Sequence, residues 1–207
     1  RHVILVRHGQ YDEDGAGDEA KSLTELGRRQ ALRTGEKLKD LLEEPLAAGK
    51  TRVRLHVSTM TRAKETAGLV ASRWPSESFD RLDASPLLVE GSPPVHNVPA
   101  PLYTAGQVHA SLMEAAFRRY FRRPALAALA EPPHGEVVPR HEYDVIVCHA
   151  NVIRFFALRA LQLPPEAWFR FHPKNCSITH LRISPEGHVD LFSFGDAGHL
   201  DAEHTTF

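Results

Sequence analysis

The sequence predicts a single α/β domain with three layers, in which a mostly parallel sheet carries an antiparallel edge strand. Two apolar runs, 3–6 and 143–148, are typical of strands that are buried on both faces of a sheet. Segments with a helical spacing of apolar residues follow these strands, and this alternation favours a parallel sheet covered by helices. Near the end of the chain, alternating segments on both sides of residues 185–187 indicate a β-hairpin.

The first half of the chain is predicted to contain two strands, each followed by a helix. The first strand covers about residues 2–8, and a polar loop then leads to Thr24, whose hydroxyl can cap a helix. Pro45 is expected to end this helix. The alternating residues 53–58 indicate the second strand, and the second helix is predicted over 61–74, where a proline follows.

The second half is predicted to hold a short strand, another strand, two helices and the hairpin. Several prolines make residues 91–101 an irregular excursion. The Pro- and Ala-rich residues 124–142 predict no defined element. The remaining elements are expected at 79–89 (short strand), 105–122 (helix), 143–148 (strand), 151–161 (helix), and 177–184 with 188–194 (hairpin).

Composition narrows the classes of partner. A chain of 207 residues with 42% hydrophobic content can bury one sizeable core, so we expect one domain over residues 1–207. The formal net charge of −1 predicts no general attraction to nucleic acid or to an anionic membrane, so any anion site must be local. Because the chain starts at Arg1 rather than Met, we expect a fragment, and a preceding segment could anchor it to a membrane.

The cysteines and histidines predict neither a disulfide framework nor a metal site. Cys148 and Cys176 are the two cysteines and form no CxxC pair, so both are expected to be buried thiols of a reducing compartment. The 13 histidines include no HExxH motif and no Cys/His cluster. The sequence therefore predicts no metal and no cofactor.

Histidines and arginines follow three of the predicted strands. Arg7 and His8 end the first strand, Arg62 follows the second, and His149 follows the strand at 143–148. Because the carboxyl ends of parallel strands meet at one edge of a sheet, we expect these four side chains to converge beside helix N-termini. Taken singly, each residue is more often structural. Together they predict a metal-free phosphate pocket, in which a neutral histidine can attack phosphorus.

Longer motifs around these residues carry a family resemblance. Arg7-His8-Gly9, Ser58-x-x-x-Arg62-Ala63-x-Glu65-Thr66, Glu90 before a loop, and His149 opening a helix occur in this order along the chain. With these motifs the chain resembles the histidine phosphatase superfamily, whose fold is phosphoglycerate mutase-like. Within it, the sequence is similar to the mitochondrial protein-serine/threonine phosphatase branch, which implies a mitochondrial location (cytoplasmic otherwise) and a homodimer. The segments that resemble this branch are 7–11, 90–93, 114–118, 148–154 and 175–179.

The resemblance implies a role for each residue of the pocket. His8 would be the nucleophile and would form a phosphohistidine. Arg7, Arg62 and His149 would bind the phosphoryl group and stabilise its charge. Glu90 would be the general acid that protonates the leaving oxygen, which requires a raised pKa of its carboxyl group.

Four further residues have weaker assignments. Gly9 is expected to let the backbone approach the anion. The backbone N–H groups of Ala150 and Asn151 are expected to contact phosphate, although Asn151 could equally be a helix cap. If Glu90 is only a loop carboxylate, Glu114 is the alternative acid.

The segment after Glu90 bears on the substrate. The glycolytic mutases of the superfamily grip their substrate with an arginine- and tyrosine-containing insertion there, whereas this chain has Gly91-Ser92-Pro93-Pro94-Val95-His96-Asn97. Mutase activity is therefore disfavoured, and a phosphatase of phosphoserine and phosphothreonine in proteins is expected. A phosphatase of small phosphate monoesters is the alternative, followed by a scaffold with weak activity. The resemblance also implies that both activity and assembly in this branch depend on segments N-terminal to this domain.

Overall fold

One six-stranded sheet lies at the centre of the computed structural model, which describes residues 1–47, 51–91, 100–123 and 141–207. The order of the strands is β3-β2-β4-β1-β5-β6. The strands are β1 (His2–Arg7), β2 (Thr51–Val57), β3 (Asp80–Arg81), β4 (His141–Cys148), β5 (Ile178–Ile183) and β6 (Val189–Asp196). The α-helices are α1 (Glu25–Ala47), α2 (Thr61–Ala71), α3 (Ala100–Tyr120) and α4 (Ala150–Ala160).

The pairing of the strands confirms the predicted sheet. β1 is parallel to β4, and β2 is parallel to both β4 and β3. β5 runs antiparallel to β1, and β6 pairs antiparallel with β5 at the edge. The parallel part arises because helices connect its strands, whereas the short turn at 184–188 can only join antiparallel neighbours.

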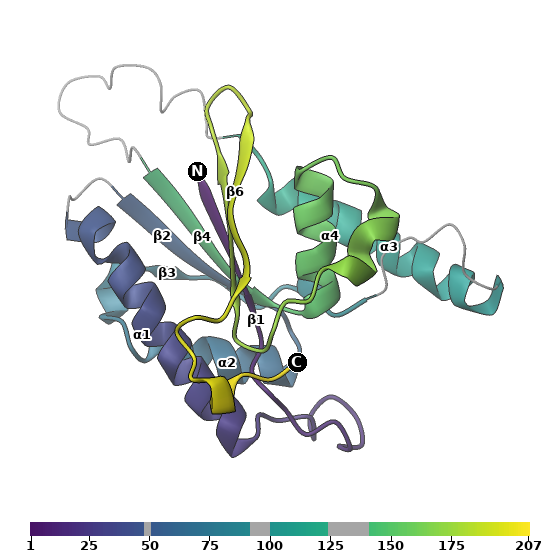
Figure 1. Cartoon of the computed structure of the whole chain (residues 1–207), viewed down its shortest axis with the longest axis horizontal. Coiled ribbons are helices and arrows are strands. Elements are labelled where there is room, and N and C mark those ends of the chain that lie inside the picture. The colour runs from purple at the N-terminus through teal and green to yellow at the C-terminus, as the bar shows by residue number, and fades with distance from the viewer. Residues whose placement is uncertain (48–50, 92–99, 124–140) are drawn as a thin grey trace.

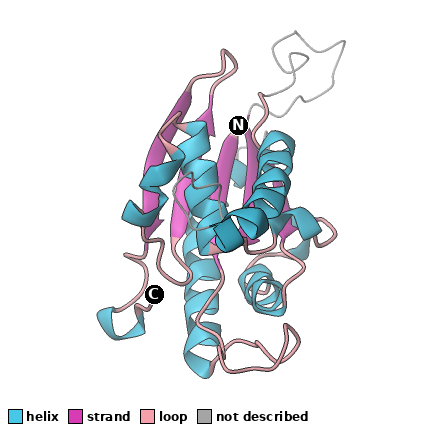
Figure 2. Ribbon diagram, turned by 90° about the vertical axis from the view of Figure 1, so that its right-hand side faces the viewer, coloured by secondary structure: helices cyan, strands magenta, loops and turns pink. Residues whose placement is uncertain are grey.

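The helices cover both faces of the sheet, which gives the three layers that were predicted. Because side chains alternate along a strand, Ile4 and Val6 of β1 pack with residues of α1 and α2, whereas Val3 and Leu5 pack with residues of α3 and α4. Figure 1 shows these two helix pairs on opposite sides of the strands. Figure 2 is seen from the side of α3 and α4 and shows helices in front of the sheet.

Several predicted boundaries were wrong. α1 continues through Pro45 to Ala47, because a proline in the last turn removes only one backbone hydrogen bond. α3 begins at Ala100 rather than at 105, since Pro101 lies in its first turn, where no helical N–H bond is needed. α2 ends at Ala71. The predictions for 92–99 and 124–140 lie outside the described residues.

β2 and β4 each begin two residues earlier than predicted, at polar residues. Thr51 is in register with His141, two residues before each apolar segment begins. Such pairing uses backbone groups, so polar side chains there do not prevent it. In the chain as far as the structure describes it, no helix is long and apolar enough to cross a membrane.

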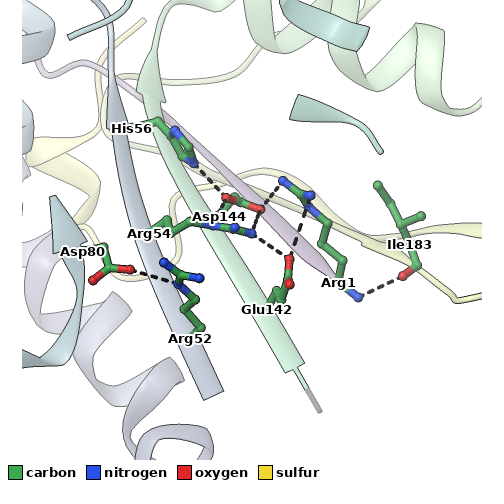
Figure 3. Close-up of polar contacts among 8 residues, drawn as sticks. All are labelled: Arg1, Arg52, Arg54, His56, Asp80, Glu142, Asp144 and Ile183. Atoms are coloured by element: carbon green, nitrogen blue, oxygen red, sulfur yellow. Dashed lines mark hydrogen bonds and ion pairs between the residues drawn. The ribbon is translucent and has the colours of Figure 1, made fainter. Parts of the chain in front are cut away.

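A cluster of charged side chains lies toward the amino ends of the parallel strands (Figure 3). The carboxylate of Asp144 is fully buried and accepts hydrogen bonds from Arg54 Nε (2.8 Å) and His56 Nε2 (2.7 Å). The buried guanidinium of Arg1 forms an ion pair with the same carboxylate. Glu142 contacts Arg54 at 2.7 Å. The buried Asp144 carboxylate is therefore paired with the cationic side chains of Arg1 and Arg54, because a charge buried without a partner is strongly unfavourable.

Candidate active site

The carboxyl edge of the sheet brings the predicted residues together. The backbone N–H of His8 donates to the carbonyl of Cys148 (3.0 Å), and that of Ser58 donates to Val147 (3.0 Å). The parallel pairing thus continues just past the ends of β1, β2 and β4. His149 is the N-cap residue of α4, and Arg62 lies in the first turn of α2.

His8 is buried and is held in one tautomer. Its Nδ1 lies 2.9 Å from the carbonyl oxygen of Gly9, and because a carbonyl only accepts, Nδ1 carries the proton. Nε2 therefore presents a lone pair, and Arg62 Nε donates to it at 3.3 Å. Burial first, then the interaction with His149, and then the charges of Arg7 and Arg62 hold the pKa of His8 well below its ordinary value of 6.5. The imidazole is thus neutral and nucleophilic at Nε2.

The other histidine is oriented as a donor. His149 Nε2 lies 2.9 Å from the hydroxyl of Ser58, which also accepts the backbone N–H of Met60 (3.3 Å). When the Ser58 proton points to Nε2, the proton of His149 lies on Nδ1, where it is available to a ligand. Burial, followed by the charge of Arg62, lowers the pKa of His149 to about 3.

Three buried N–H donors around His8 have no hydrogen-bond partner within the described chain. These are His149 Nδ1, Arg7 Nε and Arg62 Nη1. The other contacts of the arginines fix them in place, because Arg7 Nη1 donates to Pro173 (2.8 Å) and the Arg62 guanidinium lies 4.5 Å from the centre of the Tyr11 ring. Buried donors are usually satisfied. Those at this site are suited to the oxygens of an anion.

Glu90 is partly buried just after a short 3-10 helix (Pro86–Leu88). Its Oε1 accepts the backbone N–H groups of Gly91 (3.3 Å) and Asn151 (3.2 Å). Burial raises the pKa of Glu90, and the hydrogen bonds and nearby arginines only partly oppose this effect. The carboxyl group therefore has the raised pKa that a general acid needs. The backbone N–H of Asn151 donates to this carboxyl group, and its expected contact with phosphate stays a prediction.

Gly9 is required by its packing against α1. Its N–H donates to Thr66 Oγ1 (3.0 Å), and a Cβ added at Gly9 would lie 2.6 Å from the carbonyl oxygen of Gly27. A close approach to the helix is therefore one reason for glycine here, and the expected approach to an anion stays a prediction. Ala150 is the first residue of α4, directly after His149.

Glu114, the alternative acid, takes part in a separate ion-pair group. Its carboxylate contacts Arg118 Nε (3.0 Å) and Arg159 Nε (3.2 Å) at a cavity of about 630 Å³ between α3 and α4. Burial alone would raise the pKa of Glu114, but the hydrogen bonds from these arginines lower it. The lowered pKa favours the ionised form of Glu114, which has no proton to donate as a general acid.

Sequence reasoning did not single out Asp18 and Met60, which both contact Arg62. Asp18 accepts the backbone N–H of Thr61 (3.0 Å) and lies 3.6 Å from Arg62 Nη1. Met60 Sδ accepts from Arg62 Nη2 (3.5 Å) and from the N–H of Glu90 (3.4 Å). Asp18 lies in a loop without a periodic pattern, so no local signal could have found it. Met60 occupies one of the unspecified positions between Ser58 and Arg62 of the motif.

Both cysteines are free and buried, as predicted for buried thiols. Burial raises the pKa of Cys176 to about 12 and raises that of Cys148 well above its ordinary value. Among the described residues, no group of three or more His, Cys, Asp or Glu side chains is arranged to hold a metal ion.

Comparison with known families agrees with this geometry. The profile of the histidine phosphatase superfamily, branch 1, matches residues 3–86 and 122–193. The chain belongs to the histidine phosphatase superfamily. The matched segments contain Arg7, His8, Arg62 and His149, and the resemblance that the sequence predicted is confirmed at the level of the family.

Several proteins named as mitochondrial serine/threonine-protein phosphatases are similar along the whole chain. The serine/threonine-protein phosphatase Pgam5, mitochondrial, of Caenorhabditis briggsae is 42% identical over 213 residues, covering 100% of this chain and 67% of that protein. The protein of the same name from Mus musculus is 38% identical over 210 residues, covering 100% and 66%. The chain thus spans about two thirds of the length of these curated relatives.

Solved structures of other proteins share the fold. A phosphoglycerate mutase from Plasmodium falciparum matches with a TM-score of 0.60 and 34% identity, covering 100% of this chain and 97% of that chain. An alpha-ribazole phosphatase from Shigella flexneri matches with a TM-score of 0.64 and 19% identity, covering 95% and 96%. The fold is therefore phosphoglycerate mutase-like, as the sequence predicted.

Proposed function

We propose that this protein is a phosphatase of phosphoserine and phosphothreonine in proteins and that it acts through a phosphohistidine on His8 without a metal. The observation that supports this proposal most directly is the group of three buried N–H donors near the neutral His8 that have no hydrogen-bond partner among the described residues. A phosphoryl group offers three oxygens to such donors. The relatives named as serine/threonine-protein phosphatases support a protein substrate, and their names support a mitochondrial location.

In the first step, Nε2 of His8 attacks the phosphorus atom. An N–P bond forms while the bond from phosphorus to the serine or threonine oxygen breaks. Arg7, Arg62 and His149 stabilise the charge on the three equatorial oxygens, since preorganised donors in a buried site lower the energy of the transition state. Glu90 gives its proton to the leaving oxygen, which would otherwise depart as a high-energy alkoxide.

In the second step, water hydrolyses the phosphohistidine. The Glu90 carboxylate takes a proton from the water, the oxygen attacks phosphorus, and the N–P bond breaks. The electron pair returns to Nε2, so His8 and protonated Glu90 are restored. The hydrogen bond from Nδ1 to the Gly9 carbonyl keeps the same nitrogen available for the next turnover.

Trapping the intermediate tests this mechanism. After brief mixing with a radiolabelled phosphoserine peptide and denaturation in alkali, the wild-type protein should carry acid-labile label, and a His8→Ala variant should carry none. His188→Ala is the matched control, because this exposed histidine lies in the turn between β5 and β6. Failure to label the wild type, or equal turnover by wild type and His8→Ala, would refute the mechanism.

The substrate class requires a comparison of its own. Phosphoserine, phosphothreonine and phosphotyrosine peptides would be tested at matched concentration against glycerate and sugar phosphates. The proposal expects the highest kcat/KM for the phosphoserine and phosphothreonine peptides. A clear preference for a small metabolite would replace the protein substrate with a small phosphate monoester while leaving the phosphohistidine step intact.

A further inference from the structure

A fully buried glutamine of α1 joins the loop after β1 to the end of the chain. Gln30 Oε1 accepts the backbone N–H of Gln10 (2.9 Å). Its Nε2 donates to the carbonyl of His204 (2.7 Å) and to the hydroxyl of Thr206 (2.8 Å). Figure 1 shows the yellow C-terminal segment beside α1 and close to the end of β1. Both donors of the amide and its oxygen are thus used.

Thr206 reaches the same loop by a second route. Its hydroxyl donates to Asn175 Oδ1 (3.0 Å), and its carbonyl accepts the backbone N–H of Asn175 (3.0 Å). The side chain of Asn175 is buried, and its Nδ2 donates to the carbonyl of His8 (3.2 Å). One hydroxyl therefore contacts two amide side chains, and these bind the backbone before and after Gly9.

These contacts fix the peptide plane that orients the His8 ring. The carbonyl of Gly9 and the N–H of Gln10 belong to one planar peptide unit. The carbonyl receives the proton of His8 Nδ1, while the N–H donates to Gln30. A large rotation of this peptide would break both bonds, so the contact from Gln30 and the contact that holds the proton on His8 Nδ1 are linked through one peptide unit. Outer hydrogen bonds of this kind set the tautomer of a functional histidine.

We propose that Thr206 is a positioning residue for His8, an inference that rests on the proposed phosphatase function. By accepting from Gln30 and donating to Asn175, the hydroxyl fixes the direction of both amide groups. Gln30 then presents its oxygen to Gln10, and Asn175 presents its nitrogen to His8. Without the hydroxyl, a buried donor and a buried acceptor lose their partner, and both amides lose the contact that selects their orientation.

The test removes only this hydroxyl. Thr206→Val keeps the shape of the side chain, and Thr206→Ser keeps the hydroxyl and should restore function. Thr205→Val is the matched control, since the Thr205 hydroxyl donates to the carbonyl of Asp201 and not to this network. We expect Thr206→Val to slow single-turnover phosphohistidine formation by about tenfold, as outer-contact mutations do, with KM changed much less. The serine and Thr205 variants should match the wild type.

A spectroscopic measurement separates this inference from the proposed function. The 15N chemical shifts of the His8 ring should show the Nδ1–H tautomer in the wild type and a mixture in Thr206→Val, whether or not the protein hydrolyses phosphopeptides. An unchanged tautomer together with an unchanged rate in Thr206→Val would overturn the inference. The inference would also be overturned if the unfolded fraction of Thr206→Val, obtained from its urea titration, accounted for the whole loss in the rate of phosphohistidine formation. Absence of phosphohistidine in the wild type would count against the function alone.

Discussion

Replacing Asp144 by asparagine should destabilise the protein strongly without impairing its chemistry. The change keeps the shape of the side chain but removes the charge that faces Arg1 and Arg54, whose side chains are only 2% and 12% exposed. It also puts an NH₂ group beside guanidinium donors. Two buried cations then have Glu142 as their remaining carboxylate, which is itself 26% exposed.

The expected cost follows from the burial of the cluster. Breaking a buried ion pair by removing one partner costs about 3–5 kcal/mol, because the remaining charge is left uncompensated. A domain has a free energy of unfolding of about 5–15 kcal/mol, so this loss is a large part of the total. The matched control is Asp80→Asn, in the pair with Arg52 shown in Figure 3. Both side chains are more than half exposed, so that change should cost about 0–1 kcal/mol.

Urea unfolding followed by circular dichroism measures the free energy of unfolding of both variants.

The stabilisation that Asp144 provides should also depend on pH. Burial opposes ionisation of Asp144, but the hydrogen bond from His56 and the charges of the arginines lower its pKa below 3.8. Its stabilising contribution is therefore present above the unfolded pKa and is lost as the pH falls through the lower folded pKa. A loss for Asp144→Asn that is no larger than that for Asp80→Asn would refute the reasoning.

Three further predictions concern the candidate site. Glu90→Gln should lower kcat on a phosphoserine peptide by about 10²–10⁴-fold. The loss on p-nitrophenyl phosphate should be much smaller, because its leaving group needs no proton. Equal losses on the two substrates would show that Glu90 is not the general acid. Because its pKa is raised, the wild-type rate of phosphohistidine formation should fall as the pH rises through that pKa, and rapid-quench measurements on Glu90→Gln should lack this fall. Gly27→Ala should lower the free energy of unfolding, measured by urea titration, by about 1–3 kcal/mol, because the new Cβ would overlap the backbone oxygen of Gln10. Gly68→Ala in α2, where a Cβ would meet no neighbour, should raise it by up to about 1 kcal/mol. Equal effects of the two changes would contradict the packing argument.

The sequence predicted the fold where burial leaves a local mark. The apolar residues of β1 and β4 must be apolar because helices cover both faces of the sheet. The parallel order then required His8 and His149 to meet at one edge, and the structure brings them together. The polar start of β2 left no such mark, because Thr51 pairs through backbone groups with a residue far along the chain.

The residues that hold the loop of His8 in place could not be predicted from the sequence, for a related reason. Gln30 and Asn175 contact the loop after β1 from 20 and 167 positions away. A buried amide has no periodicity that distinguishes it from a surface amide. Its meaning depends on partners that only the folded chain brings close. The separation of Glu90 from Glu114 likewise required the neighbours of each carboxylate to be known, since their types are identical in the sequence.

The buried thiols have a consequence for the conditions in which such an enzyme can work. Phosphatases that use a cysteine nucleophile need a thiolate, and the thiolate is also the form that peroxides oxidise. Here Cys148 and Cys176 keep their protons because burial raises the pKa of each, and the proposed nucleophile is an imidazole. Dephosphorylation by this protein would therefore continue during an oxidative burst that silences cysteine-dependent phosphatases.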